Sequence, residues 1–152
     1  KAKKAQRAGT FKKEIVPVQL KKGVFDIDEH PREVSMAALS RLKPVFTSEG
    51  SVTAGNASGI NDGAAYMIVS SDEKAKELGL DPIGEVISYA VAGVEPSIMG
   101  IGPVPAMTKA LAKAGLTIDD IDLVELNEAF AVQSLAVLCD FPSPAEKLNV
   151  NG

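Results

Sequence analysis

Residues 121–131 read Ile-Asp-Leu-Val-Glu-Leu-Asn-Glu-Ala-Phe-Ala and give the clearest indication of the fold. The apolar run Ile121–Leu126 predicts a strand. Residues 128–138 predict a helix with one apolar face. Asn127 stands at the junction between them. Polar side chains at the carboxyl end of a strand in an α/β sheet lie where ligands usually bind, so this junction is the first candidate site.

Outward from this stretch, apolar runs alternate with helical patterns. The sequence predicts helices over 1–9, 34–42, 73–78 and 106–114, an edge strand over 11–20, a short buried helix running into a strand over 64–70, and a central strand over 83–94. Such alternation favours α/β layers around a largely parallel sheet. A change in composition near Asp81-Pro82 marks the expected boundary between two units.

Composition excludes several classes of protein. The 152 residues are 45% hydrophobic and 24% charged, a balance typical of globular chains rather than disordered ones. No run approaches the ~18 consecutive apolar residues of a membrane span, and no secretory signal is recognisable at Lys1-Ala2-Lys3-Lys4. The single cysteine, Cys139, fits a reducing compartment. With one histidine, His30, a Cys/His zinc site is nearly excluded.

Charge is distributed unevenly. Residues 1–46 hold 11 basic and 5 acidic side chains (net +6), whereas residues 47–152 hold 5 and 15 (net −10). A basic patch attracts phosphates, whether on a cofactor or on nucleic acid. Binding to nucleic acid is poorly supported, because only Phe11 lies near the patch to stack on bases.

The segment Val52–Ala65 is rich in Gly, Ser and Asn. It is either a tight turn between two buried elements or a loop that a ligand or another backbone can approach closely. It lacks the Gly-Lys-Ser/Thr of a P-loop and the GxGxxG spacing of a dinucleotide site. The Gly/Pro segment 100–106 is expected to be a structural loop.

Three polar residues admit more than one interpretation. Asn127 can stabilise an oxyanion with its amide, or it can simply cap the following helix. Cys139 ends an apolar helix with no histidine in its unit, so a structural role is expected. His30, in Asp-Glu-His-Pro, is expected to be a solvated loop histidine.

Several motifs together resemble the thiolases, the family of acetyl-CoA acetyltransferases and 3-ketoacyl-CoA thiolases. They are Val52–Ala65, Gly93–Pro103, Asn127–Ala131 and the terminal Asn149-Val150-Asn151-Gly152. The resemblance covers essentially the whole chain. It implies thiolase-like αβαβα layers, incomplete here: residues 1–46 as the end of a CoA-binding loop domain, 47–80 as the end of the N-terminal half, and 81–152 as the start of the C-terminal half.

The resemblance also implies roles for individual residues. Asn127 would hold a water in an oxyanion hole. The residues implied to bind the CoA part of the substrate are Ser58 with Ala54 and Phe46 on the pantetheine arm, Ala129 and Phe130 along the tunnel, and Arg32 near the adenine nucleotide. Coenzyme A and acyl-CoA would be substrates, with no metal and no permanent cofactor. The complete enzyme would be a cytoplasmic homodimer or homotetramer that binds neither membrane nor nucleic acid.

The family's nucleophilic cysteine and activating histidine are expected outside this sequence, and Cys139 matches neither. We therefore expect an internal segment of a longer thiolase, inactive alone. The complete enzyme would cleave 3-ketoacyl-CoA thiolytically or condense acetyl-CoA units. The alternative is a non-catalytic module that binds CoA or contacts another subunit.

Overall fold

A computed structural model describes all residues, 1–152. The helices are α1 (Ala2–Ala8), α2 (Met36–Leu39), α3 (Asp72–Glu77), α4 (Pro103–Ala114) and α5 (Ala131–Asp140), with 3₁₀ helices η1 (Pro96–Ile101) and η2 (Ile118–Asp120). The strands are β1 (Val18–Leu20) and β2 (Gly23–Phe25). They form a two-stranded antiparallel hairpin with Leu20 opposite Gly23. No helix is long and apolar enough to cross a membrane.

Local signals in the sequence position the helices. Ser71 caps α3, where its hydroxyl accepts a hydrogen bond from the Lys74 N–H. Gly9 and Gly115 end α1 and α4 in the left-handed conformation, with φ of 73° and 70°, which glycine adopts without steric cost. These stops agree with the predicted ends of both helices. Helix α4 begins three residues before the predicted start, because Pro103 fits the first helical turn.

Two predicted helices are shorter than the sequence indicated. The helix expected over 34–42 is reduced to the four residues of α2, which Ser35 caps. The helix expected from 128 begins at Ala131, because the Ala131 N–H donates instead to the Asn56 carbonyl, 2.9 Å away. The edge strand expected over 11–20 is present only at β1.

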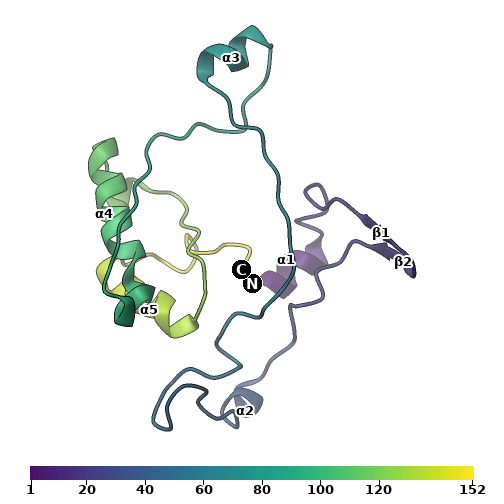
Figure 1. Ribbon diagram of the computed structural model, residues 1–152, viewed down its shortest axis with the longest axis vertical. Coiled ribbons are helices and arrows are strands. Elements are labelled where there is room, and N and C mark those ends of the chain that lie inside the picture. Colours follow the sequence, from purple (N-terminus) through teal and green to yellow (C-terminus); the bar gives the residue numbers. More distant parts are fainter.

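The strands expected over 64–70 and 83–94 do not form within this chain, nor does the short helix expected before the first of them. Both segments follow open paths between α2, α3 and α4 (Figure 1). The strand expected over 121–126 is reduced to a single parallel bridge between Val124 and Leu148. The reason is physical: a central strand needs hydrogen-bonded neighbours and layers on both faces, and these 152 residues supply neither.

Without strand partners, most of the apolar side chains of residues 64–70 and 83–94 are exposed to solvent. Tyr66 is 95% exposed and Ile68 92%. The chain exposes 12563 Å², whereas a compact protein of 15.9 kDa exposes about 7,400 Å². Six residues are buried: Ala5, Ala75, Leu126, Ser134, Val137 and Asn149. The chain is therefore an open framework rather than a domain with one core.

Two clusters of elements are visible in Figure 1. Helices α4 and α5 contact each other and η1, and α1 lies near the β1–β2 hairpin, while α3 stands apart. The two ends of the chain lie together. The Lys1 ammonium donates to the carbonyls of Ala145 and Leu148, and Gly152 lies against Ala2. Residues 121–130 and 145–152 thus converge close to α1.

Candidate functional site

The loop at residues 52–58 is held by its own polar side chains. The Asn56 side-chain oxygen accepts from the Thr53 N–H at 2.8 Å, and its amide nitrogen donates to the Ser51 carbonyl at 2.9 Å. Val45 N–H donates to the Val52 carbonyl at 2.9 Å, which ties the segment carrying Phe46 to the start of the loop. The loop is consequently fixed before any ligand binds.

Close approach explains two glycines in this loop. A Cβ at Gly55 would lie 2.5 Å from Leu39 Cδ2, so α2 packs directly on its backbone. A Cβ at Gly59 would lie 2.3 Å from His30 Cε1. His30 is exposed, as expected, but its ring also covers Gly59. Of the two interpretations of this segment, close approach of other parts of the chain is the one observed.

The loop meets the segment that follows Asn127. Ser58 N–H donates to the Ala129 carbonyl, and Ala131 N–H donates to the Asn56 carbonyl, both at 2.9 Å. These bonds form an antiparallel bridge between Ala57 and Phe130. Above them the Phe46 and Phe130 rings meet edge to face, with centroids 6.1 Å apart. Phe46, Ser58, Ala129 and Phe130, which the resemblance assigned to the CoA part of the substrate, therefore lie together.

Ala54 and Arg32 belong to the edge of this arrangement. Ala54 is exposed in the fixed loop, beside Gly55. Arg32 is exposed and follows His30 by two residues. Because the His30 ring lies against Gly59, Arg32 stands close to the glycine-rich loop. No hydrogen bond or ion pair joins Arg32 to the other predicted residues. The ion pair of this region is Arg7–Glu33, between two exposed side chains.

Asn127 is exposed at the wall of an open cavity of about 490 Å³. The other lining residues are Glu125, Leu126, Glu128, Asn149 and Gly152. Asn127 precedes α5 by four residues, and the residue at the helix N-cap position is Phe130. The capping alternative is therefore wrong, because Asn127 lies outside the first turn of α5.

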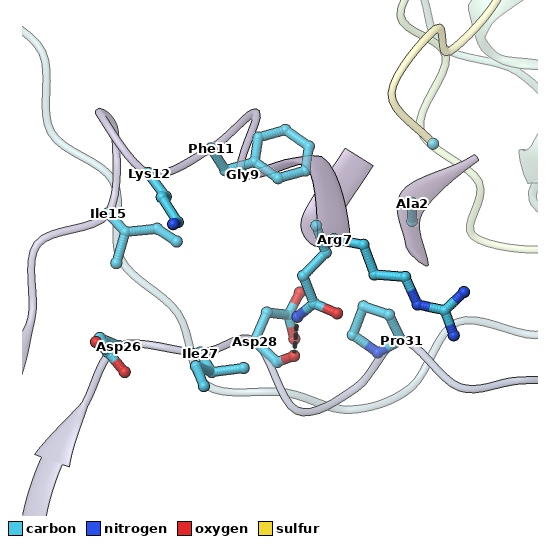
Figure 2. A pocket seen from close by; sticks show the side chains of 12 residues that line it. Ala2, Arg7, Gly9, Phe11, Lys12, Ile15, Asp26, Ile27, Asp28 and Pro31 are labelled. Carbon is cyan, nitrogen blue, oxygen red and sulfur yellow. Dashed lines mark hydrogen bonds between the residues drawn. The ribbon is translucent and has the colours of Figure 1, made fainter. Parts of the chain in front are cut away.

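A second cavity, of about 600 Å³, lies between α1 and residues 26–31 (Figure 2). Arg7, Phe11, Lys12 and Ile15 line it, and the Gln6 amide donates to the Asp28 carbonyl across it at 2.6 Å. None of the site residues predicted from the sequence lines it. Ala2 and Gly152 line its edge.

Two carboxyl groups at helix starts away from these cavities have lowered pKa values. Hydrogen bonds from the backbone and hydroxyl of Thr117 hold the pKa of the Asp120 carboxyl below its ordinary value. Its own backbone N–H and the Ser71 hydroxyl lower the pKa of Glu73. No cluster of three or more His, Cys, Asp or Glu side chains has the arrangement of a metal site.

Asn149 is a site residue that sequence reasoning did not single out. It was quoted only within the terminal motif, yet it is buried and lines the Asn127 cavity. Its backbone has a φ of 41°, the left-handed region that asparagine tolerates better than most residues. Asparagine followed by glycine three residues later, in Asn149-Val150-Asn151-Gly152, was the available signal, but this signal does not identify a partner.

Comparison with known proteins gives consistent results. The family model "Thiolase, N-terminal domain" matches residues 1–73, and "Thiolase, C-terminal domain" matches residues 80–152. The acetyl-CoA acetyltransferase of Syntrophomonas wolfei is 60% identical over 99% of this chain. That of Allochromatium vinosum is 53% identical over the whole chain. The chain spans 40% of the length of each of these relatives.

Solved structures agree with the sequence matches. Human mitochondrial 3-ketoacyl-CoA thiolase in complex with CoA superimposes with a TM-score of 0.95 at 48% identity, covering 99% of this chain and 38% of that chain. The acetyl-CoA acetyltransferase of Bacillus anthracis gives 0.94 at 51% identity, covering 99% and 40%. The expected α/β, thiolase-like fold is thereby confirmed. The chain follows the path of this fold even where its strands lack neighbours.

Proposed function

This chain belongs to the thiolase family, and from that premise we propose that it forms the acyl-CoA-binding and oxyanion-stabilising part of an acyl-CoA C-acyltransferase. One observation carries the proposal. The loop at 52–58 and the segment 127–131 are joined by the Ser58–Ala129 and Ala131–Asn56 hydrogen bonds. Residues with implied roles on the same ligand thus meet at one place, although some 70 residues separate them in sequence.

The proposed roles follow from the chemistry of each side chain. The Asn127 amide carries two N–H donors, and it is exposed to a cavity. Such donors stabilise negative charge that develops on a carbonyl oxygen. Ser58 offers a hydroxyl to the pantetheine arm, and Ala54 leaves room beside it. Phe46, Ala129 and Phe130 offer an apolar wall to the pantetheine and acyl chain.

The nucleotide end of the substrate would meet the basic part of the chain. Residues 1–46 carry a net charge of +6, which attracts the phosphates of coenzyme A. Arg32 is the proposed contact near the adenine nucleotide. It is exposed and lies two residues after His30, whose ring packs against Gly59. CoA and acyl-CoA are proposed as substrates rather than permanently bound groups. The solved CoA complex of a thiolase that this chain resembles supports that choice.

The reaction we propose for the complete enzyme is the reversible thiolase exchange. A cysteine thiolate attacks the 3-keto carbonyl, the bond between C2 and C3 breaks, and the released enolate is protonated to acetyl-CoA. The thiol of a second CoA then takes the acyl group from the cysteine. Asn127 would stabilise charge on the thioester or keto oxygen during these steps.

The thiolate and its activating imidazole are assigned to residues outside this sequence. Cys139 lies in the last turn of α5, where its thiol donates to the Leu135 carbonyl at 3.5 Å. His30 lies on Gly59. Neither residue matches the motif of a thiolase nucleophile or base. This chain therefore positions substrate, and the complete polypeptide supplies the reactive pair.

The proposed division places residues 1–46 in the loop domain, 47–80 in the N-terminal half and 81–152 in the C-terminal half. The separate matches over 1–73 and 80–152 support a boundary near residue 80. We further propose a homodimeric or homotetrameric enzyme in the cytoplasm, a reducing compartment that suits the free thiol of Cys139.

Steady-state kinetics of thiolysis test the proposal. The test protein, called the full-length thiolase below, is a complete thiolase polypeptide that contains residues 1–152. Replacing the corresponding stretch of the S. wolfei acetyltransferase with this sequence provides it. Asn127→Ala should lower kcat about a hundredfold to a thousandfold with acetoacetyl-CoA, the magnitude for loss of one oxyanion donor. Gln19→Ala, in the exposed β1–β2 hairpin, is the matched control.

The same measurements distinguish the proposed catalytic role from the alternative of a non-catalytic module. Unchanged kcat in Asn127→Ala, with a melting temperature equal to that of the parent, would contradict the catalytic assignment. Tight CoA binding by residues 1–152 alone, together with an inactive full-length thiolase, would favour a non-catalytic CoA-binding or subunit-interaction module.

A further inference from the structure

The side chain of Asn149 holds both chain neighbours of Asn127. Its Oδ1 accepts from the Leu126 N–H at 2.7 Å. Its Nδ2 donates to the Leu126 carbonyl at 2.9 Å and to Glu128 Oε1 at 2.8 Å. An asparagine amide has two donor hydrogens and an acceptor oxygen. All three are engaged, on the residues that immediately precede and follow Asn127.

Asn149 is itself rigidly held. It is 5% exposed, and its N–H donates to the Val124 carbonyl at 2.8 Å, while the Val124 N–H donates to the Lys147 carbonyl at 2.9 Å. This is the parallel bridge between Val124 and Leu148. Leu126 is also buried, at 9% exposed. Hydrogen bonds among buried groups are electrostatically stronger than exposed ones. The side-chain amide of Asn149 is therefore held in one position.

We propose that Asn149 is a positioning residue that sets the orientation of Asn127 toward the reacting oxygen. The inference rests on the proposed function, because it assumes that Asn127 acts on substrate. A donor that stabilises transition-state charge must be in place before the charge develops. Asn127 is exposed on the cavity wall and depends on its backbone for placement. Asn149 fixes the backbone of Leu126 before Asn127 and the side chain of Glu128 after it.

Asn149→Asp is the informative substitution, since it preserves the shape of the side chain while it replaces the donor Nδ2 by an oxygen and adds a negative charge. One carboxylate oxygen still accepts from the Leu126 N–H. The other replaces the donor Nδ2 and faces the Leu126 carbonyl and the Glu128 carboxylate, two groups that it repels. The bonds to the Leu126 carbonyl and to the Glu128 side chain are then lost, and a shift of about 1 Å in a catalytic group can cost a hundredfold in rate.

Kinetics of the full-length thiolase give the test. Asn149→Asp should lower kcat about tenfold to a hundredfold while KM for the acyl-CoA changes by less than about threefold. Lys147→Met is the matched control, because the Lys147 ammonium donates to the Ile121 carbonyl at 3.0 Å and joins the same two segments away from Asn127. It should leave kcat unchanged. Equal losses of kcat in both variants would mean general loosening and would overturn the inference.

A double mutant separates this inference from the proposed function. In Asn127→Ala/Asn149→Asp, kcat should equal that of Asn127→Ala alone, because nothing remains to be positioned; multiplied losses would overturn the inference. If Asn127→Ala lowers kcat and folded Asn149→Asp does not, the inference alone is wrong. If Asn127→Ala itself has no effect, the proposed function is wrong.

Glu128→Ala provides a second route where Asn149→Asp does not fold. It removes only the 2.8 Å bond to Asn149 Nδ2 and leaves Asn149 in place. We expect a severalfold loss of kcat with KM unchanged, absent when Asn127 is already alanine. An unchanged kcat in Glu128→Ala would overturn the inference.

Discussion

Ser58 and Ala129 are joined by a backbone hydrogen bond of 2.9 Å, from the Ser58 N–H to the Ala129 carbonyl. The two residues lie in segments that match different thiolase domains, 1–73 and 80–152. Their bond makes the glycine-rich loop and the Asn127 segment one continuous surface. The proposed acyl-CoA site stands on that junction, and substitutions that disturb it should weaken substrate binding.

The Gly59–His30 contact offers a clean perturbation of the junction. In Gly59→Ala the new Cβ would lie 2.3 Å from His30 Cε1, so the His30 ring must turn away or push the segment toward Arg32 outward. We expect a severalfold rise in KM for acyl-CoA in the full-length thiolase. His30→Ala should restore KM in the Gly59→Ala background; failure to do so would exclude the clash as the cause.

The Phe46–Phe130 pair should contribute to binding of the pantetheine arm. Edge-to-face aromatic pairs are worth about 0.5–1.5 kcal/mol beyond their buried area. Phe46→Leu should therefore raise KM about two- to tenfold with little change in kcat. Phe141→Leu, beyond the end of α5, serves for comparison. Equal KM values for both variants and the parent would show that the pair does not shape the site.

The pH response of η2 follows from the Thr117–Asp120 capping box. Thr117 N–H and hydroxyl both donate to Asp120 Oδ2 at 2.8 Å and hold the Asp120 pKa below its ordinary value. A lowered folded-state pKa stabilises the fold above the unfolded pKa, and this contribution is lost as pH falls through the folded value. NMR titration of Asp120 in the full-length thiolase should show its pKa rising in Thr117→Ala. An identical titration curve would contradict the assignment.

The 152-residue chain by itself should be expanded or self-associated. Strands without neighbours and apolar side chains in water favour association through sheet edges and patches. A compact monomer of this length has a radius of gyration of about 15 Å. Small-angle scattering should give a clearly larger value or a higher mass. A monodisperse species near that radius, unfolding cooperatively, would refute the expectation.

Local signals predicted local structure well. Gly9, Gly79 and Gly115 ended helices where expected, and Ser71 capped α3. Such features depend on a few neighbouring residues. The expected strands over 64–70 and 83–94 depend instead on partners far away in sequence, and those partners are not among these residues. Their apolar content predicted buried strands, whereas the structure leaves both segments largely exposed and without strand partners.

The site residues show the same contrast between features that a local motif indicates and features that depend on distant partners. Motif resemblance indicated Phe46, Ser58, Ala129 and Phe130, and the structure brings these four together. Asn149 was missed because its importance lies in three hydrogen bonds to residues more than 20 positions away. No spacing rule predicts such a partner. The roles of all seven predicted residues, the four that lie together as well as Asn127, Ala54 and Arg32, remain predictions for experiment.

A crystal structure of the full-length thiolase with CoA tests the central claim most directly. We predict the pantetheine arm against Ser58 and the Phe46–Phe130 pair, with its thiol end directed toward the Asn127 cavity. CoA bound instead in the cavity between α1 and residues 26–31 (Figure 2), with the Ser58–Ala129 junction empty, would contradict the account.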